Sequence, residues 1–273
     1  MKKKRLSPLS KIYLALILFF LYAPIGVMAL FSFNESTSTY IFSDFSLKWW
    51  GEMFNNSAAT DSLKNSLILA VCTAVISTVM GTCAAVGIFN YRNKRLKRAV
   101  LTVTNIPMMN PEIVTGVSMM LLFVFLGASI KISDSLNFWS LLAAHITFCL
   151  PYVILNVMPK LKQLDINIYE AAVDLGCKPV KAFFKVVLPN ITTGIITGLV
   201  MSFTLSLDDF IISYFTSGPS FQTLPIYIFS LTKKRVKPDM YALSTLIFLV
   251  ILVLLILMNA AQSKAEKGKS EGK

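Results

Sequence analysis

The chain has 273 residues, 55% of them hydrophobic and 15% charged, and its mean hydropathy is +0.66. This composition is too apolar for a soluble globular domain and indicates a membrane protein. A net charge of +12 would suggest a nucleic-acid partner in a soluble chain. Here the basic residues are unevenly distributed between the loops, and such a distribution indicates the orientation of a membrane protein. We therefore expect no nucleic-acid partner.

Six predominantly apolar segments are long enough to cross a bilayer, because a helical span needs about 20 such residues. We therefore predict an all-α, polytopic membrane protein whose residues 1–273 form a single transmembrane domain. The predicted spans are residues 12–31, 65–89, 99–125, 138–158, 191–215 and 241–261.

The orientation in the membrane follows from the lysines and arginines, which favour cytoplasmic loops. If both termini lie in the cytoplasm, the inner segments hold 19 of the 26 basic residues. The outer segments then hold seven, four of them within Lys233–Lys237. We predict cytoplasmic N- and C-termini. Lys233–Lys237 has no assigned role beyond a contact with an external partner.

The outer segment between the first two spans contains an amphipathic stretch with Trp49, Trp50 and Phe54. Aromatic side chains of this kind favour the headgroup level of the bilayer. We predict an interfacial helix that contacts lipid, with a contact to an external protein as the alternative.

The third and fourth predicted spans contain residues that are unusual in a membrane helix. Pro107 and Pro111 lie close together in the third span and are followed by Glu112. Proline removes helix hydrogen bonds, so we expect this span to be kinked or broken beside a carboxylate. The fourth span carries His145, which we interpret as an interhelical hydrogen-bonding residue.

A polar loop, residues 159–190, separates the fourth and fifth spans and reads as two short helices hinged at glycine. Glu170 lies in the first turn of the first of these helices, where its charge suits the helix dipole. Ala171 and Ala172 are small enough for close approach to a partner. Gly176 permits a reversal of the backbone, and Leu188-Pro189 begins the next span.

The glutamate, two alanines, glycine and leucine-proline, at this spacing, resemble the signature loop of binding-protein-dependent ABC importer permeases. The resemblance implies a type I importer permease fold and a bacterial inner-membrane location. It also implies three partners: a homologous second permease, a cytoplasmic ATPase dimer and an extracytoplasmic binding protein.

Cofactor and metal expectations follow from the motifs that the sequence lacks. It has no G-x-x-x-x-G-K-[ST] phosphate-binding loop, so ATP and Mg should bind to the ATPase partner and this chain should not be an enzyme. The four cysteines show no metal-ligand spacing, and we expect neither a metal site nor a cofactor in the chain.

Two adjacent carboxylates, Asp208 and Asp209, lie in the fifth predicted span. Charged residues at membrane depth cost about 2.5–3.5 kcal/mol each on insertion scales and tend to be functional. Successive helix residues point about 100° apart. We therefore expect one of the two to face a pathway while the other pairs with a neighbour or caps a helix. In the alternative interpretation both are structural residues near the outer interface.

Acidic side chains without matching lysines in the spans suit a cationic cargo. The stretches Ser202–Phe210, Tyr214–Ser220 and His145–Tyr152 look like the second permease of spermidine/putrescine importers. The resemblance implies a polyamine-binding protein as partner and a polyamine as cargo. The predicted pathway residues are Glu112, Asp208 and Asp209 with the aromatic residues Tyr152, Tyr214 and Phe203.

Other functions remain open. A related ABC importer for another small solute would share the loop, and a cation channel subunit would also place carboxylates in its spans. An intramembrane aspartyl protease needs its two aspartates on facing helices, whereas Asp208 and Asp209 are adjacent. A secondary transporter should contain inverted repeats, and none is apparent. We predict a permease that works by alternating access.

Overall fold

The computed structural model describes residues 8–36, 41–131, 134–219, 221–233, 240–253 and 256. These residues form helices, with an isolated antiparallel bridge between Asn34 and Phe45. The all-α prediction is confirmed. The chain divides into two compact units, residues 1–60 with 228–253 and residues 61–227 with 254–273, and each is described by itself below.

Five helices in the described part of the chain are long and apolar enough to cross a bilayer. They cover Leu9–Phe31, Ser57–Phe89, Glu112–Ile130, Phe138–Gln163 and Pro179–Asp208. The sixth predicted span begins with a shorter apolar helix, Met240–Val253. The rest of that prediction, Ile256 excepted, lies outside the described residues.

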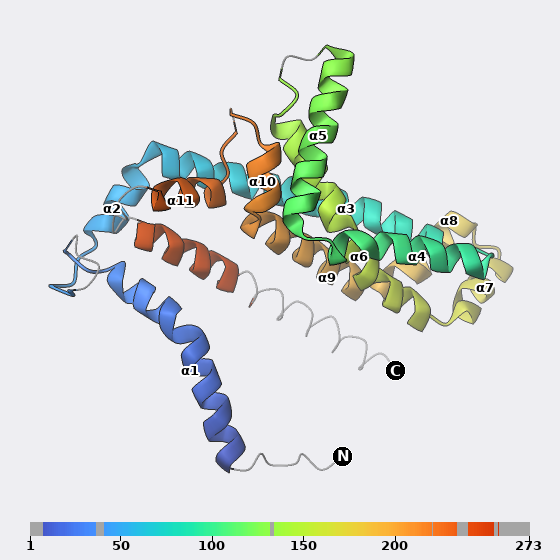
Figure 1. Cartoon of the computed structure of the whole chain (residues 1–273). Coiled ribbons are helices and arrows are strands. Elements are labelled where there is room, and N and C mark those ends of the chain that lie inside the picture. The colour runs from blue at the N-terminus through green and yellow to red at the C-terminus, as the bar shows by residue number, and fades with distance from the viewer. Residues whose placement is uncertain are drawn as a thin grey trace. The chain divides into compact units, whose positions relative to one another are not determined.

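The first unit contains helix α1 (Pro8–Phe31) and helix α2 (Lys48–Asn55) (Figure 1). No residue in the most apolar window of α1 is buried against the rest of the chain. A helix that is apolar on every face needs an apolar surrounding, so this exposure suits a lipid-facing span.

The segment between α1 and α2 is held together by hydrogen bonds around Asn34. This buried side chain donates to the Ile41 carbonyl at 2.8 Å and accepts from the Ser43 amide at 2.9 Å. The Trp49 indole donates to the Asn34 carbonyl at 2.7 Å. Trp49 of α2 is thus buried against the segment that precedes its helix, whereas Phe54 is exposed. Helix α2 confirms the predicted helix, and its place at the bilayer surface stays a prediction.

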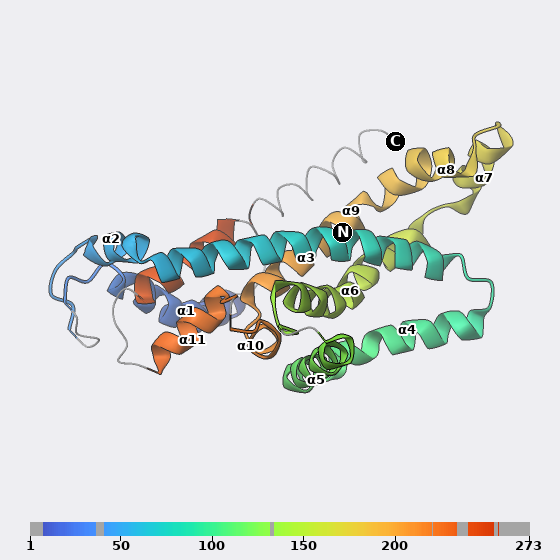
Figure 2. The same ribbon diagram turned by 90° about the horizontal axis from the view of Figure 1, so that it is seen from above.

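The second unit is built around three long helices that run alongside one another, α3 (Ser57–Phe89), α6 (Phe138–Gln163) and α9 (Leu188–Asp208) (Figure 2). Helix α3 starts eight residues before its predicted start at Asn65. Its first turn is polar, and the Asn56 side chain caps it by accepting from the Ala58 amide at 3.1 Å. Hydropathy alone does not detect such a turn.

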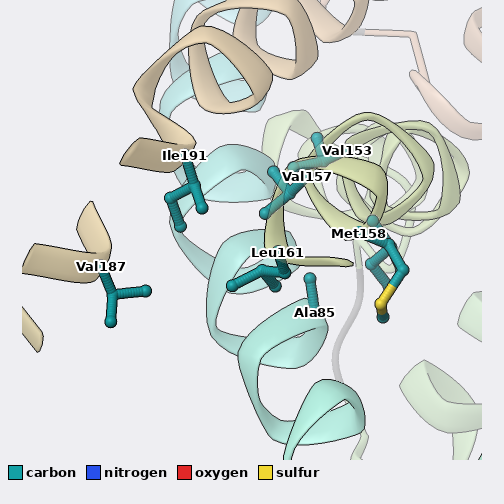
Figure 3. Packing of buried hydrophobic residues seen from close by; sticks show 8 residues of the cluster. Ala85, Val153, Val157, Met158, Leu161, Val187 and Ile191 are labelled. Atoms are coloured by element: carbon teal, nitrogen blue, oxygen red, sulfur yellow. The ribbon is translucent and has the colours of Figure 1, made fainter. Parts of the chain in front are cut away.

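The core between these helices is made of small and branched apolar side chains (Figure 3). Its buried members include Ala85, Val153, Val157, Met158, Leu161, Val187 and Ile191. Gly194 lets α9 approach α6 closely, because a Cβ atom there would lie 2.7 Å from the Asn156 carbonyl oxygen. The same exclusion of larger side chains at a helix contact is typical of membrane bundles.

The third predicted span is broken, as its prolines suggested. Helix α4 (Lys94–Met109) ends at Asn110, and α5 (Glu112–Ile130) begins after Pro111. The two helices meet at a sharp angle (Figure 1). Pro107 lies inside α4 and does not end this helix, so we attribute the break to Pro111. Residues 99–125 are therefore two helices rather than one kinked span.

The fifth predicted span, residues 191–215, is also broken, and here the prediction of a continuous helix was wrong. Helix α9 ends at Asp208, Asp209 is extended with ψ at 122°, and α10 (Ile211–Thr216) follows. The Asp209 carboxylate accepts hydrogen bonds from the Ile212 and Ser213 amides at 3.3 and 2.8 Å. These amides begin a new helix, which replaces the continuation of α9. Helix α11 (Leu224–Thr232) comes after α10.

The loop between α6 and α9 contains α7 (Ile166–Asp174), α8 (Pro179–Ala182) and a π-helical turn η1 (Phe183–Val187). Gly176 separates α7 from α8 with φ at +83°, which confirms the predicted glycine hinge. The turn η1 leads directly into α9. Helix α6 extends to Gln163, so the two flanking helices occupy both ends of the predicted loop.

Candidate functional site

The two helix breaks of the second unit meet at one cavity of about 360 Å³. Glu112, from the first turn of α5, lies on one side of it. The end of α9 and the start of α10 supply the other side, and α6 contributes Phe148. The described lining residues are Glu112, Phe148, Thr204, Leu205, Asp208, Asp209, Phe210 and Ile211. Broken helices that surround a cavity at membrane depth are a recurrent feature of transport proteins.

All three carboxylates that the sequence singled out line this cavity, and no lysine or arginine is among its described lining residues. Glu112 and Asp208 are exposed, whereas Asp209 is only 8% exposed. The cavity is therefore acidic, and two of its carboxylates can reach a bound molecule directly. Such a site would favour a cation over an anion.

The aromatic lining of the cavity differs from the aromatic residues chosen from the sequence. Phe148 and Phe210 line it, while Tyr152, Tyr214 and Phe203 are not among its lining residues. Tyr152 packs edge-on against Phe148 with ring centroids 5.7 Å apart, and Tyr214 packs against Phe210 at 5.5 Å. Two of the three chosen residues thus contact lining residues without lining the cavity themselves.

The sequence held a signal for the aromatic residues that were missed. Phe148 precedes Tyr152 by four residues, so both lie on one face of α6. Phe210 follows directly after the aspartate pair, at the helix break. If α9 continued unbroken past Asp209, the Phe210 side chain would point in a different direction. Its place in the cavity lining therefore depends on the helix break.

His145 connects three helical segments beside the cavity. Its Nδ1 lies 2.8 Å from the Ser206 hydroxyl of α9, and its Nε2 lies 3.0 Å from the Ser213 hydroxyl of α10. Nε2 is also 3.5 Å from the Asp209 carboxylate. All four side chains are buried. The interhelical hydrogen-bonding role predicted for His145 is confirmed.

The loop residues form a second candidate site. The Asp165 side chain caps α7 by accepting from the Asn167 amide at 3.1 Å. Helix α7 begins at Ile166 and has no acidic residue in its first turn, so the prediction that Glu170 lies in the first turn was wrong. Glu170 and Ala171 are exposed on α7, and Ala172 is half-buried. Leu188 and Pro189 occupy the first turn of α9. An exposed helix with small residues beside a carboxylate leaves room for a partner's backbone.

A cavity of about 260 Å³ lies beneath α7, at the ends of α3 and α6. Phe89, Leu161, Tyr169, Glu170 and Phe183 are among its lining residues. Glu170 therefore lies at the edge of an apolar hollow.

Metal binding finds no support in the described residues, since no group of three His, Cys, Asp or Glu side chains there could hold a metal ion.

The helices and sites described so far define a polytopic helical membrane protein with an acidic cavity between broken spans and an exposed loop helix. Residues 74–269 match the family described as "Binding-protein-dependent transport system inner membrane component". The chain belongs to this family. It is thus an inner-membrane component of a transport system, and the predicted family is confirmed.

Curated relatives cover almost the whole chain. The putrescine transport system permease protein PotI of Escherichia coli strain K12 is 36% identical over 261 residues, which is 96% of this chain and 93% of that protein. The spermidine/putrescine transport system permease protein PotC of the same strain is 37% identical and covers 92% of each chain. The Haemophilus influenzae PotC protein is 38% identical, over 90% of this chain and 93% of that protein.

Solved structures share the fold at low sequence identity. A bacterial ABC transporter involved in the import of the acidic polysaccharide alginate aligns with a TM-score of 0.70 and 18% identity, over 93% of this chain and 94% of that chain. The MetNI methionine ABC transporter aligns with a TM-score of 0.60 and 15% identity, over 75% of this chain and 94% of that chain. The predicted ABC transporter permease fold is confirmed.

Proposed function

We propose that this chain is the permease subunit of an ATP-driven importer that moves polyamines, spermidine or putrescine, into the cytoplasm. The observation that carries this proposal is the acidic cavity, where Glu112 and Asp208 are exposed and no lysine or arginine is among the described lining residues. The relatives named for putrescine and spermidine transport support the same cargo class.

The chemistry of the cavity suits a flexible chain with several ammonium groups. The two exposed carboxylates, Glu112 and Asp208, can accept hydrogen bonds from ammonium groups, and such charge-assisted bonds are stronger than neutral ones. The rings of Phe148 and Phe210 offer faces to the cation and to the methylene segments between the nitrogens. Tyr152 packs against the Phe148 ring and Tyr214 against the Phe210 ring. Phe203 of α9 stays a predicted pathway residue.

The loop site would couple transport to ATP. Glu170, Ala171 and Ala172 would enter a groove of the cytoplasmic ATPase dimer, which binds ATP and Mg. Gly176 and the Leu188-Pro189 start of α9 would transmit closure of that dimer to the spans. The chain itself would then hydrolyse nothing.

The other partners follow from the same proposal. A homologous second permease would complete the pathway, as the resemblance to importer permeases implies. An extracytoplasmic polyamine-binding protein would deliver the cargo, and lipid would surround α1. The loop charges support a cytoplasmic location for both termini and for the α6–α9 loop.

The test is uptake of radiolabelled spermidine and putrescine by proteoliposomes. They contain this chain with its co-purifying permease and ATPase, the binding protein outside and ATP inside. We expect uptake that needs both ATP and binding protein. The matched control carries ADP in place of ATP.

Each other outcome identifies a competing function. A complex whose ATPase responds to its binding protein but which moves no polyamine would assign the chain to an importer for another solute. Cation flux without ATP, at equal rates in both directions, would instead support a channel subunit and contradict the proposal.

A further inference from the structure

Asp209 faces a different environment from its neighbour Asp208, although both line the cavity. Asp208 is exposed, whereas Asp209 is 8% exposed and its carboxylate oxygens already accept the Ile212 and Ser213 amides. The His145 ring lies 3.5 Å away on its inner side. We propose that Asp209 is a positioning residue rather than a cargo ligand, and that with His145 it holds Asp208 toward the cavity. The proposal rests on the proposed transport function only in what it says of cargo.

The first step of the argument concerns the start of α10. The first amides of a helix lack partners within the helix, and a buried helix start must find them elsewhere. Asp209 supplies both of its oxygens to this purpose. A cargo ammonium group that took these oxygens would leave two buried amides unpaired, which is costly. Both carboxylate oxygens of Asp209 are therefore occupied by backbone amides.

The second step concerns the connection to α6. His145 bonds to Ser206 before the break and to Ser213 after it, so one ring fixes both sides of the interruption. At the far end of α10, the Ser140 hydroxyl of α6 donates to the Thr216 carbonyl at 3.0 Å. Helix α10 is thus attached to α6 near each of its ends.

The third step concerns the direction of Asp208. This residue closes α9, and its neighbour on the C-terminal side is held inward by the contacts just described. Asp209 itself is extended and lies outside α9, so its direction follows from these contacts and not from the helical repeat. With Asp209 fixed toward His145, Asp208 is left on the cavity side, opposite the first turn of α5 that carries Glu112.

The experiment measures cysteine accessibility in the assembled complex, which needs no transport activity. In a background with Cys72, Cys83, Cys149 and Cys177 replaced by alanine, Asp208→Cys and Asp209→Cys are reacted with a cationic methanethiosulfonate reagent. We expect Asp208→Cys to react at least about tenfold faster, since a buried thiol is both shielded and less ionised.

The role of His145 is tested by replacing it and measuring the ratio of the two reaction rates, Asp208→Cys to Asp209→Cys. His145→Ala should reduce the rate ratio to about twofold or less, because the hydrogen bonds to both sides of the break are lost. His145→Asn keeps a donor and an acceptor and should restore part of the ratio. Thr147→Ala is the matched control, since Thr147 is exposed on the same helix and its hydroxyl donates to the Ala143 carbonyl within its own turn.

Two results would overturn the proposal: equal reaction rates at the two positions in the intact background, or a ratio that His145→Ala leaves unchanged. If the Asp209→Cys variant does not assemble, the test uses the reaction rate of Asp208→Cys alone. Equal rates for Asp208→Cys in the His145→Ala and Thr147→Ala backgrounds would then contradict the proposal. Failure of polyamine uptake, by contrast, would overturn the proposed function and leave the accessibility pattern intact.

Discussion

At the residue scale, the cavity separates groups that look equivalent in the sequence. Glu112 and Asp208 reach it from two different helix breaks, and Asp209 is used by the start of α10. The proposed site therefore has two free carboxylates, contributed by α5 and α9. Cargo binding should depend on these two and on the charge of the cargo.

Replacing Glu112 by Gln or Asp208 by Asn should weaken polyamine uptake mainly by raising KM. Each change removes one charged acceptor of similar shape, and hydrogen bonds to charged groups contribute about 1.5–3 kcal/mol. That corresponds to a rise in KM of about tenfold to a hundredfold. Concentration-dependent uptake in proteoliposomes measures it.

A suitable control for these substitutions is Asp61→Asn. Asp61 is an exposed carboxylate on α3 whose pairing with Lys64, at 3.8 Å, is also exposed. Such surface pairs contribute little. An Asp208→Asn complex that transports polyamines with unchanged KM would remove Asp208 from the cargo site.

At the element scale, the sequence predicted one helix break and missed the other for a physical reason. Pro111 forbids a continuous helix on its own, so the α4–α5 break follows from local chemistry. The α9–α10 break contains no proline or glycine. It depends on Asp209 bonding to amides ahead of it and on His145, which is 64 residues away along the chain. Such tertiary causes cannot be read from a local pattern.

Gly176→Val should uncouple the loop from the ATPase. Gly176 has φ at +83°, a region that costs an L-residue roughly 1–2 kcal/mol. Branching at Cβ adds to that strain, so the turn between α7 and α8 should be displaced. We expect ATPase activity stimulated by the binding protein to fall at least about fivefold.

Gly176→Asn provides the comparison for that variant, because asparagine tolerates positive φ better than other residues. It should retain most of the stimulated ATPase activity. Equal losses in both variants would point to a contact at this position rather than to backbone conformation.

Gly194→Val should destabilise the packing of α9 on α6. A Cβ atom at Gly194 would lie 2.7 Å from the Asn156 carbonyl oxygen, which is backbone and cannot rotate away. Overpacking of this kind costs about 1–3 kcal/mol. The expected result is a lower thermal midpoint of the detergent-purified complex. Gly87→Val on α3, where nothing lies within 4 Å of the added Cβ, should leave the midpoint unchanged.

At the scale of the whole molecule, apolar composition and the length of the apolar segments were enough to predict the all-α membrane fold. Apolar length could not locate the polar first turns, as the early start of α3 shows. The carboxylates of the candidate site were also predictable, because charge at membrane depth is costly. Unequal roles for Asp208 and Asp209 were also expected, and Asp209 does cap a helix. The sequence could not tell which of the two does so, since this depends on contacts between α6, α9 and α10.

The proposed orientation can be tested with Cys177, which lies directly after the Gly176 hinge and is half-buried. A membrane-impermeant thiol reagent should label it in inside-out vesicles and not in sealed right-side-out cells. Cys83 is exposed on α3 within a predicted span, where a water-soluble reagent should not reach it in either preparation. Labelling of Cys177 from the outside would reverse the topology.

The π turn η1 has a consequence for how force can pass from the loop into the membrane. The Leu188 amide reaches back five residues to the Phe183 carbonyl, so this turn holds one residue more than an α-helical turn. Each residue of an α-helix advances the side-chain direction by about 100°. The extra residue therefore shifts the side-chain directions of the loop by about that angle relative to those of α9. The extra residue of a π turn can also shift from one turn of the helix to the next. Such a shift can accommodate a rotation of the loop relative to α9. We therefore expect α9 to be tilted or pulled by its loop rather than twisted, so that its packing face stays against α6 throughout the cycle.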